Sequence, residues 1–133
     1  MRFLFDSPLS QMYVYSESAS SLATNKMAEI FSLIDKRLES QETKDSKYLV
    51  GNSLSAADIY WATMSMAVLP VPLSIMPKTK QNQGMLMFFE SNSKIPKIKE
   101  VLSQRLIDHQ HYILNTYCET PAILGGDTLN EWK

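Results

Sequence analysis

The stretch Tyr48-Leu49-Val50-Gly51-Asn52-Ser53-Leu54-Ser55-Ala56-Ala57-Asp58-Ile59-Tyr60-Trp61 contains the signals for a turn, a helix start and a buried anchor. Ser55 is a candidate N-cap, and Asp58 stands at the third helical position, where its carboxylate can reach back to the Ser55 amide. This pattern is a capping box with aspartate in place of the usual glutamate or glutamine. The carboxylate also lies in the first turn, where the helix dipole favours negative charge. The stretch therefore predicts a helix that begins at Ala56.

Two further residue choices around this cap are informative. Leu54 precedes the cap and Ile59 occupies the fourth helical position, which is the spacing of a hydrophobic staple. Gly51 can adopt a positive φ that Leu49 and Val50 could not, so the chain is expected to reverse there. From the cap alone, we expect Asp58→Ala to lower the free energy of unfolding by roughly 1 to 2 kcal/mol.

The combination of Tyr48-Leu49-Val50-Gly51, a short polar link and Leu54-Ser55-Ala56-Ala57-Asp58-Ile59-Tyr60-Trp61-Ala62 closely resembles the C-terminal helical domain of glutathione S-transferases. The resemblance is specific over residues 48–62 and looser over about 20–118. In that family the capped helix is buried in the middle of an all-α domain. The resemblance implies an all-α fold, a helical bundle of the glutathione S-transferase C-terminal type around a buried central helix at about residues 55–69.

Helical periodicity places the other expected elements. Ser7 and Pro8 are typical of a helix start, which predicts a short helix through about Tyr15. Residues 20–40 should form a helix whose core face carries Ala23, Met27, Ile30, Phe31, Ile34 and Leu38. The capped helix should end near Leu69, before Pro70, with small residues at Ala56, Ala57, Ala62 and Ala67 for close approach of neighbours. A short helix is expected at 85–89, its aromatic end packed against the central one. Pro96 should open one last long helix to about Tyr117, with an apolar stripe comprising Ile95, Ile98, Leu102, Leu106, His109, Ile113 and Tyr117.

Composition describes an ordinary single domain spanning residues 1–133. The chain is 44% hydrophobic and 20% charged, with a formal net charge of -1 and no basic run, which argues against nucleic acid as a partner. One cysteine gives no internal disulfide framework and agrees with a cytoplasmic location. The first apolar run is too short for a signal peptide. The segment 59–76 carries no charge, but Pro70 and Pro72 would break it, so no membrane span is expected.

The residues that could carry chemistry are few. His109 and His111 are separated by about 200° of helix rotation, so they cannot bind one metal ion together. We interpret His109 as a core histidine and His111 as solvent-exposed. Cys118 has no partner positioned by spacing, and the carboxylate of Asp58 is already used by the cap. The sequence therefore predicts no catalytic residue and no metal site.

The resemblance implies where the missing chemistry would come from. In glutathione S-transferases a thioredoxin-like half holds most of the glutathione site and the catalytic residue, while the helical half supplies the wall of the apolar substrate pocket and part of the dimer contact. Tyr13 and Tyr15 stand where that wall would be, so they are the candidate pocket residues. Glutathione is implied only if a thioredoxin-like half is supplied. The implied partners are a second copy of the chain or a thioredoxin-like partner domain.

Three functions remain open at this point. The first is an interaction or dimerisation module without activity as an isolated chain. The second is the substrate-binding half of a glutathione transferase whose other half is missing or on another chain. The third possibility is a binder of small apolar ligands in a pocket lined by some of its eight methionines.

Overall fold

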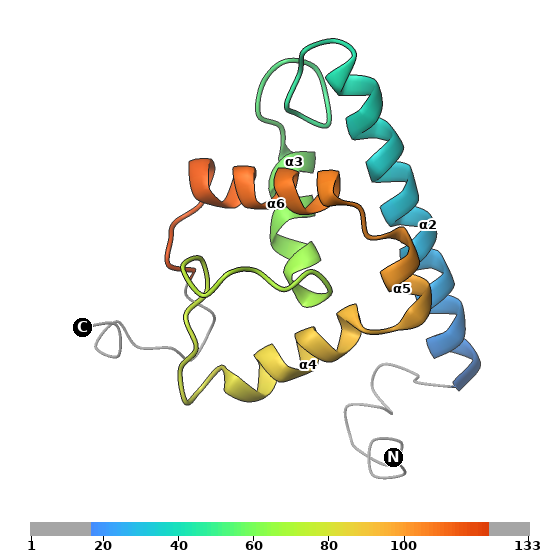
Figure 1. Ribbon diagram of the computed structural model, residues 1–133, viewed down its shortest axis with the longest axis vertical. Helices are drawn as coiled ribbons and strands as arrows, with labels where there is room; N and C mark the ends of the chain where they lie inside the picture. The colour runs from blue at the N-terminus through green and yellow to red at the C-terminus, as the bar shows by residue number, and fades with distance from the viewer. Residues whose placement is uncertain (1–16, 123–133) are drawn as a thin grey trace.

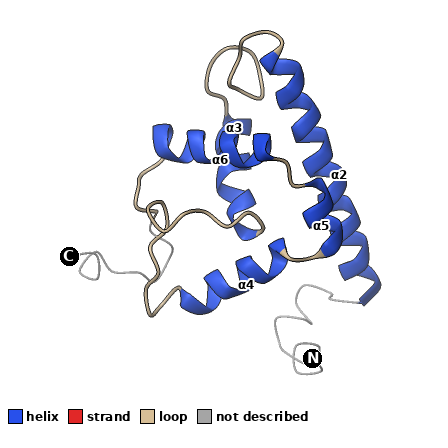
Figure 2. Ribbon diagram, viewed as in Figure 1, coloured by secondary structure: helices blue, strands red, loops and turns tan. Residues whose placement is uncertain are grey.

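A computed structural model describes residues 17–122 of the chain, and these residues form helices and loops without a strand (Figure 2). The helices are α2 (Glu17–Glu42), α3 (Ala56–Met64), the short 3-10 helix η2 (Ser65–Ala67), α4 (Gln83–Ser93), α5 (Pro96–Val101) and α6 (Gln104–Tyr117). The prediction of an all-α fold is confirmed. The helix predicted from Pro8 to Tyr15 lies outside the described residues.

The long helix α2 runs along one side of the domain, and the other helices lie to one side of it (Figure 1). Both α5 and α6 contact α2, while α6 also packs on α3 and α4 contacts η2. Arg105 fastens α6 to α2, because its guanidinium lies 3.1 Å from Asp35 and 3.1 Å from Glu42. Within the described residues, no helix is long and apolar enough to cross a membrane.

The buried face of α2 carries Ala28, Phe31 and Leu38, which belong to the main core cluster. The prediction that Ala23 and Ile30 lie on this face is wrong, because both side chains are exposed. Ile30 precedes Phe31, so its side chain leaves the helix about 100° away from that core position. The apolar residues of α2 therefore lie on two faces, and only one of them is covered.

Helix α3 buries one face rather than its whole circumference, which corrects the prediction of a fully buried central helix. Asp58, Trp61 and Ala62 are buried, whereas Tyr60 is 66% exposed and Met64 is also exposed. Trp61 meets Phe31 of α2 edge to face, with the ring centroids 5.2 Å apart. The α-helix ends at Met64, five residues earlier than predicted, and η2 continues the chain. Of the predicted small contact residues, Ala62 is fully buried and Ala67 half-buried, while Ala56 and Ala57 are exposed.

The single helix predicted from Pro96 to Tyr117 is two helices, because the chain is extended at Leu102 and Ser103. Ser103 caps α6, and its hydroxyl accepts a hydrogen bond from the Leu106 amide at 3.3 Å. Ile98 of α5 and Leu106 of α6 nevertheless enter the same core cluster. The apolar periodicity therefore continues across the break, which explains why it suggested one helix. Tyr117, assigned to the apolar stripe, is exposed.

Helix α4 is longer than the predicted 85–89, and its aromatic end does not fill the core. Phe88 is exposed and Phe89 only half-buried. The end of α4 is instead held by Asn92, whose side-chain amide donates to the Ala67 carbonyl at 3.0 Å. The outer face of α4 is therefore an open apolar surface.

Candidate functional site

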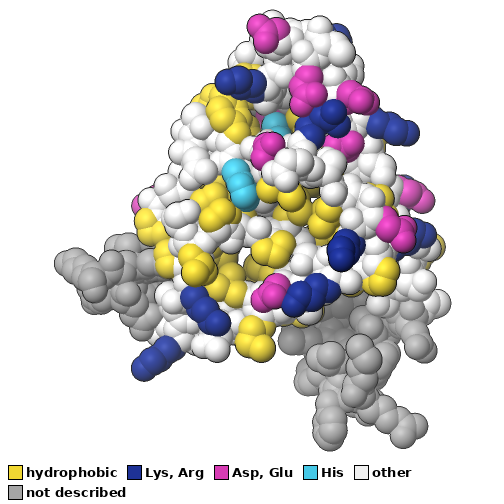
Figure 3. Space-filling view, viewed as in Figure 1, with side chains coloured by type: hydrophobic (Ala, Val, Ile, Leu, Met, Phe, Trp, Pro, Cys, Tyr) yellow, Lys and Arg dark blue, Asp and Glu magenta, His cyan; other side chains and the backbone are white. Residues whose placement is uncertain are grey.

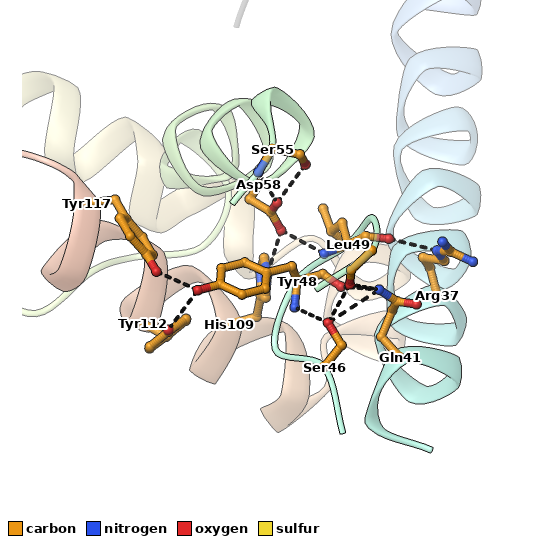
Figure 4. A network of polar contacts seen from close by, with 11 residues as sticks. Arg37, Gln41, Ser46, Tyr48, Leu49, Ser55, Asp58, His109, Tyr112 and Tyr117 are labelled. Atoms are coloured by element: carbon orange, nitrogen blue, oxygen red, sulfur yellow. Dashed lines mark hydrogen bonds and ion pairs between the residues drawn. The ribbon is translucent and has the colours of Figure 1, made fainter. Parts of the chain in front are cut away.

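Asp58 is the centre of a polar network that joins three parts of the fold (Figure 4). Its carboxylate is fully buried and accepts from the Leu49 amide at 2.7 Å, from the Ser55 amide at 2.9 Å and from the Ser55 hydroxyl at 2.6 Å. The two residues stand in the geometry of a capping box at the start of α3, although the Ser55 hydroxyl donates to the carboxylate. One side chain thus fixes both the helix start and the preceding turn.

His109 of α6 completes the coordination of this carboxylate. Its Nε2 lies 3.1 Å from Asp58 Oδ1, and the histidine side chain is almost fully buried. Burial lowers the pKa of His109 below its ordinary value, and the neighbouring Asp58 offsets only part of that effect. Burial alone would raise the pKa of Asp58, but the bonds from Ser55 and Leu49, with His109, bring it below its usual value. The pair is therefore a carboxylate that accepts from a neutral imidazole at neutral pH.

This pair predicts a pH dependence of stability. An unfolded chain protonates His109 near its ordinary pKa of about 6.5, while the folded chain resists protonation until a lower pH. The unfolded state then binds more protons in this window, so the free energy of unfolding falls as the pH drops below about 6.5. Urea unfolding at a series of pH values measures the slope. His109→Gln should remove most of it and His111→Gln should not; equal slopes in both variants would contradict the assignment.

The turn before α3 is held from the other side by α2. The Gln41 side-chain amide donates to the carbonyls of Tyr48 and Gly51, at 2.8 Å each, and the Arg37 guanidinium donates to the Leu49 carbonyl at 2.7 Å. Gly51 has a φ of 65°, which confirms the predicted positive value. Three carbonyls of this turn therefore have partners from α2, so the turn is tied to α2, α3 and α6 together.

Three tyrosines converge at one edge of the network. The Tyr48 hydroxyl lies 2.5 Å from that of Tyr117 and 3.4 Å from that of Tyr112. These hydrogen bonds raise the pKa of Tyr48 and lower that of Tyr112, and Lys47 over the Tyr112 ring contributes to the lowering. The three hydroxyls are each other's partners, so the cluster closes the end of α6 against the turn.

A buried aspartate and histidine also occur in hydrolases, where the second ring nitrogen activates a nucleophile. Here Nδ1 of His109 has no hydrogen-bond partner within residues 17–122. A cavity of about 310 Å³ borders the ring, and its charged lining residues are two acids and two bases. This balance favours neither cations nor anions. The pair as it stands links α3 to α6.

A second cavity, of about 300 Å³, lies between α4 and the connection from α3. We call it the methionine pocket, because three methionines are among its lining residues, which are Met66, Pro70, Val71, Leu73, Met76, Lys78, Leu86, Met87, Phe89 and Glu90. On the face shown in Figure 3, hydrophobic side chains gather between α6 and α4. The methionine content of the sequence suggested an apolar pocket. Its position could not be predicted, because the loop from 70 to 82 has no helical or strand periodicity.

The remaining predicted site residues are placed as follows. Leu54 is exposed, whereas Ile59 is half-buried, so the two residues of the predicted staple differ in burial. Ile59 packs against a second core cluster, which comprises Ala62, Met66, Ile75, Met76, Ile113 and Leu114. Tyr13 and Tyr15 lie outside the described residues. Cys118 is a free, half-buried thiol. His111 is half-buried rather than solvent-exposed, and its Nε2 has no partner in the described part of the chain. Sequence reasoning missed Gln110, a fully buried residue whose side-chain amide donates to the Ser65 hydroxyl at 2.9 Å.

The fold and the network together define an all-helical domain built on a helix that a buried aspartate caps. The family model described as "Glutathione S-transferase, C-terminal domain" matches residues 5–105. The chain therefore belongs to the glutathione S-transferase C-terminal domain family. Comparisons with curated proteins and with solved structures gave no match. The matched range includes Ser55 and Asp58 but ends before His109, so the α6 side of the network lies beyond it.

Proposed function

We propose that this chain is an interaction module that associates with a second copy of itself through the outer face of α2. The observation that carries the proposal is a set of large apolar side chains left exposed on that helix. Leu22 is 70% exposed and Leu33 is 68% exposed, and Ile30 is exposed between them. At 100° per residue, these three positions fall within about 80° of one another on the helix. They form a stripe opposite the buried face, which we call the α2 stripe.

The surroundings of the α2 stripe favour a second copy as the occupant. Lys26 and Glu29 lie within the stripe and pair with each other at 3.1 Å, and both are exposed. An antiparallel second helix would bring the lysine of one copy near the glutamate of the other, as an isologous interface requires. Beside the stripe, α2 and α5 enclose a shallow cavity of about 440 Å³, whose apolar lining residues are Ala28, Leu33 and Val101 and whose polar ones are Asn25, Glu29, Ser32, Lys36 and Lys97. A leucine of the second copy could therefore pack on the α2 stripe and enter the cavity between α2 and α5.

The mass of the chain in solution tests this proposal. Sedimentation velocity of the full chain should give about twice the 15.2 kDa monomer mass, in a concentration-dependent equilibrium. Leu33→Glu should shift the equilibrium to monomer, because it removes an apolar side chain from the interface and introduces a charge that must lose its hydration there. Leu73→Glu is the matched control, since Leu73 is similarly exposed but lies far along the chain in the loop before α4. A wild-type monomer at all concentrations, or equal effects of the two substitutions, would refute the proposal.

A second candidate function rests on the methionine pocket: binding of a small apolar molecule. Its volume is at the lower end of the range for ligand pockets, and its lining is mostly apolar. Methionine side chains are flexible and polarizable, so they adapt to ligands of different shapes. Binding would raise the melting temperature by mass action. A flat melting temperature across a panel of apolar dyes would count against this candidate.

A further inference from the structure

The methionine pocket carries charged groups as well as apolar ones, and their balance suggests a class of ligand. Eight of its ten lining residues are apolar, and the other two are Lys78 and Glu90. The side chains of Leu73 and Met87 in the lining are exposed. An apolar chain placed there would remove this surface from water, which is the main source of affinity for such a ligand.

The charges of the two polar lining residues are not equally available. Glu90 pairs with Lys94 one turn later, at 2.8 Å, and this bond lowers the pKa of Glu90, which stays ionised and paired. Lys78 makes no ion pair within 4 Å among residues 17–122, although its charge also acts on Glu90. With the acid already neutralised by Lys94, the rim of the pocket has one uncompensated positive charge. This favours an anionic end group over a neutral or cationic one.

The size of the pocket limits the apolar part. A volume of about 300 Å³ lies at the lower end of the range for ligand pockets, so the pocket suits a medium-length alkyl chain better than a long one. Longer chains would extend beyond the lining into water, and much shorter ones would leave Leu73 and Met87 exposed.

We propose that the methionine pocket binds medium-chain carboxylates, with the alkyl chain against the methionines and the carboxylate paired with the Lys78 ammonium. The inference rests on the second candidate function given above, that this pocket takes an apolar ligand. It adds the end group and the chain length. It is independent of the α2 stripe, because none of the lining residues of the pocket lies on α2.

Isothermal titration calorimetry of the full chain with decanoate and with decanol, both below their aggregation limits, tests the inference. Decanoate should bind more tightly than decanol. Lys78→Gln should weaken decanoate binding by about two- to fivefold, the effect of an exposed ion pair, and leave decanol binding unchanged. Lys80→Gln is the matched control, because Lys80 is exposed two residues along the same loop and does not line the pocket. Met87→Glu should abolish decanoate binding by placing a carboxylate in the lining.

The possible failures are distinct. Equal binding of decanol and decanoate, or equal effects of Lys78→Gln and Lys80→Gln, overturns the carboxylate assignment and leaves the apolar pocket standing. No binding of either compound overturns both this inference and the second candidate function. Binding of decanoate that Met87→Glu does not reduce places the ligand elsewhere and also refutes the inference.

Discussion

Replacing Asp58 by alanine is expected to lower the free energy of unfolding by about 3 to 5 kcal/mol, because several hydrogen bonds to a buried carboxylate are lost and each contributes about 1.5 to 3 kcal/mol. The substitution leaves the Leu49 amide, the Ser55 amide and the His109 Nε2 proton without their acceptor inside the protein. This exceeds the loss of about 1 to 2 kcal/mol expected from the cap alone. The difference comes from the bonds to the Leu49 amide and to His109 of α6, which the capping box does not include.

Urea unfolding of the wild type, Asp58→Ala and Asp108→Ala measures this effect. Asp108 is an exposed aspartate on α6, and among residues 17–122 its carboxylate accepts only from Gln104 on its own helix, so its loss should change stability by less than about 0.5 kcal/mol. If Asp58→Ala costs no more than Asp108→Ala, the network is not formed. A loss near 1 kcal/mol would indicate a cap without the bond to His109.

The second large effect is expected at Trp61, the buried aromatic anchor of α3. Trp61→Ala should lower the free energy of unfolding by about 3 to 5 kcal/mol, because it removes the edge contact with Phe31 and leaves a cavity between α3 and α2. The neighbouring Tyr60 is an exposed aromatic on the same helix, so Tyr60→Ala should cost within about 0.5 kcal/mol. Guanidinium unfolding compares the two variants. Similar losses would mean that α3 does not present Trp61 to the core.

Asp58→Ala and Trp61→Ala both test the contacts that fix α3 in the fold. The sequence predicted the local contacts at the start of this helix. The helix start was readable because Ser55 and Asp58 are three residues apart and act within one turn. Gly51 was readable for the same reason, since a positive φ is a local requirement. The class of fold followed from these local signals and the family resemblance, because together they specify a helix that must be covered by others.

The parts that the sequence did not predict depend on tertiary contacts. In α2 the apolar residues at 30 and 31 are adjacent, and periodicity alone assigned both to the core, whereas only Phe31 reaches it. In the last segment, Ser103 is a usual N-cap residue, but the apolar spacing continued across it and concealed the break. Local patterns give the presence of helices more reliably than their exact faces and ends.

In the candidate site, too, local features were predictable from the sequence and tertiary contacts were not. The position of His109 on an apolar stripe indicated burial, and the structure confirms it. Its partner could not be inferred, because Asp58 is 51 residues away and the pairing depends on how α6 crosses α3. The position of the methionine pocket could not be predicted from the sequence for a similar reason. Its lining residues come from a loop without periodicity as well as from α4.

Asp58 is a structural residue that connects the turn, α3 and α6, while the two surfaces proposed to bind other molecules lie elsewhere. The α2 stripe and the methionine pocket share no residue with the network around Asp58. Substitutions there should therefore change association or ligand binding with little effect on stability. Substitutions in the network should change stability first.

A double-mutant cycle between Asp58 and His109 measures whether the two side chains stabilise the fold as a coupled pair. The free energies of unfolding of Asp58→Asn, His109→Gln and the double variant are measured in urea at neutral pH, where the imidazole is neutral. Residues in one hydrogen-bond network show coupling, and we predict an interaction energy of about 1 to 3 kcal/mol between these two. Losses that add within about 0.3 kcal/mol would show that Asp58 and His109 act independently and would contradict the account.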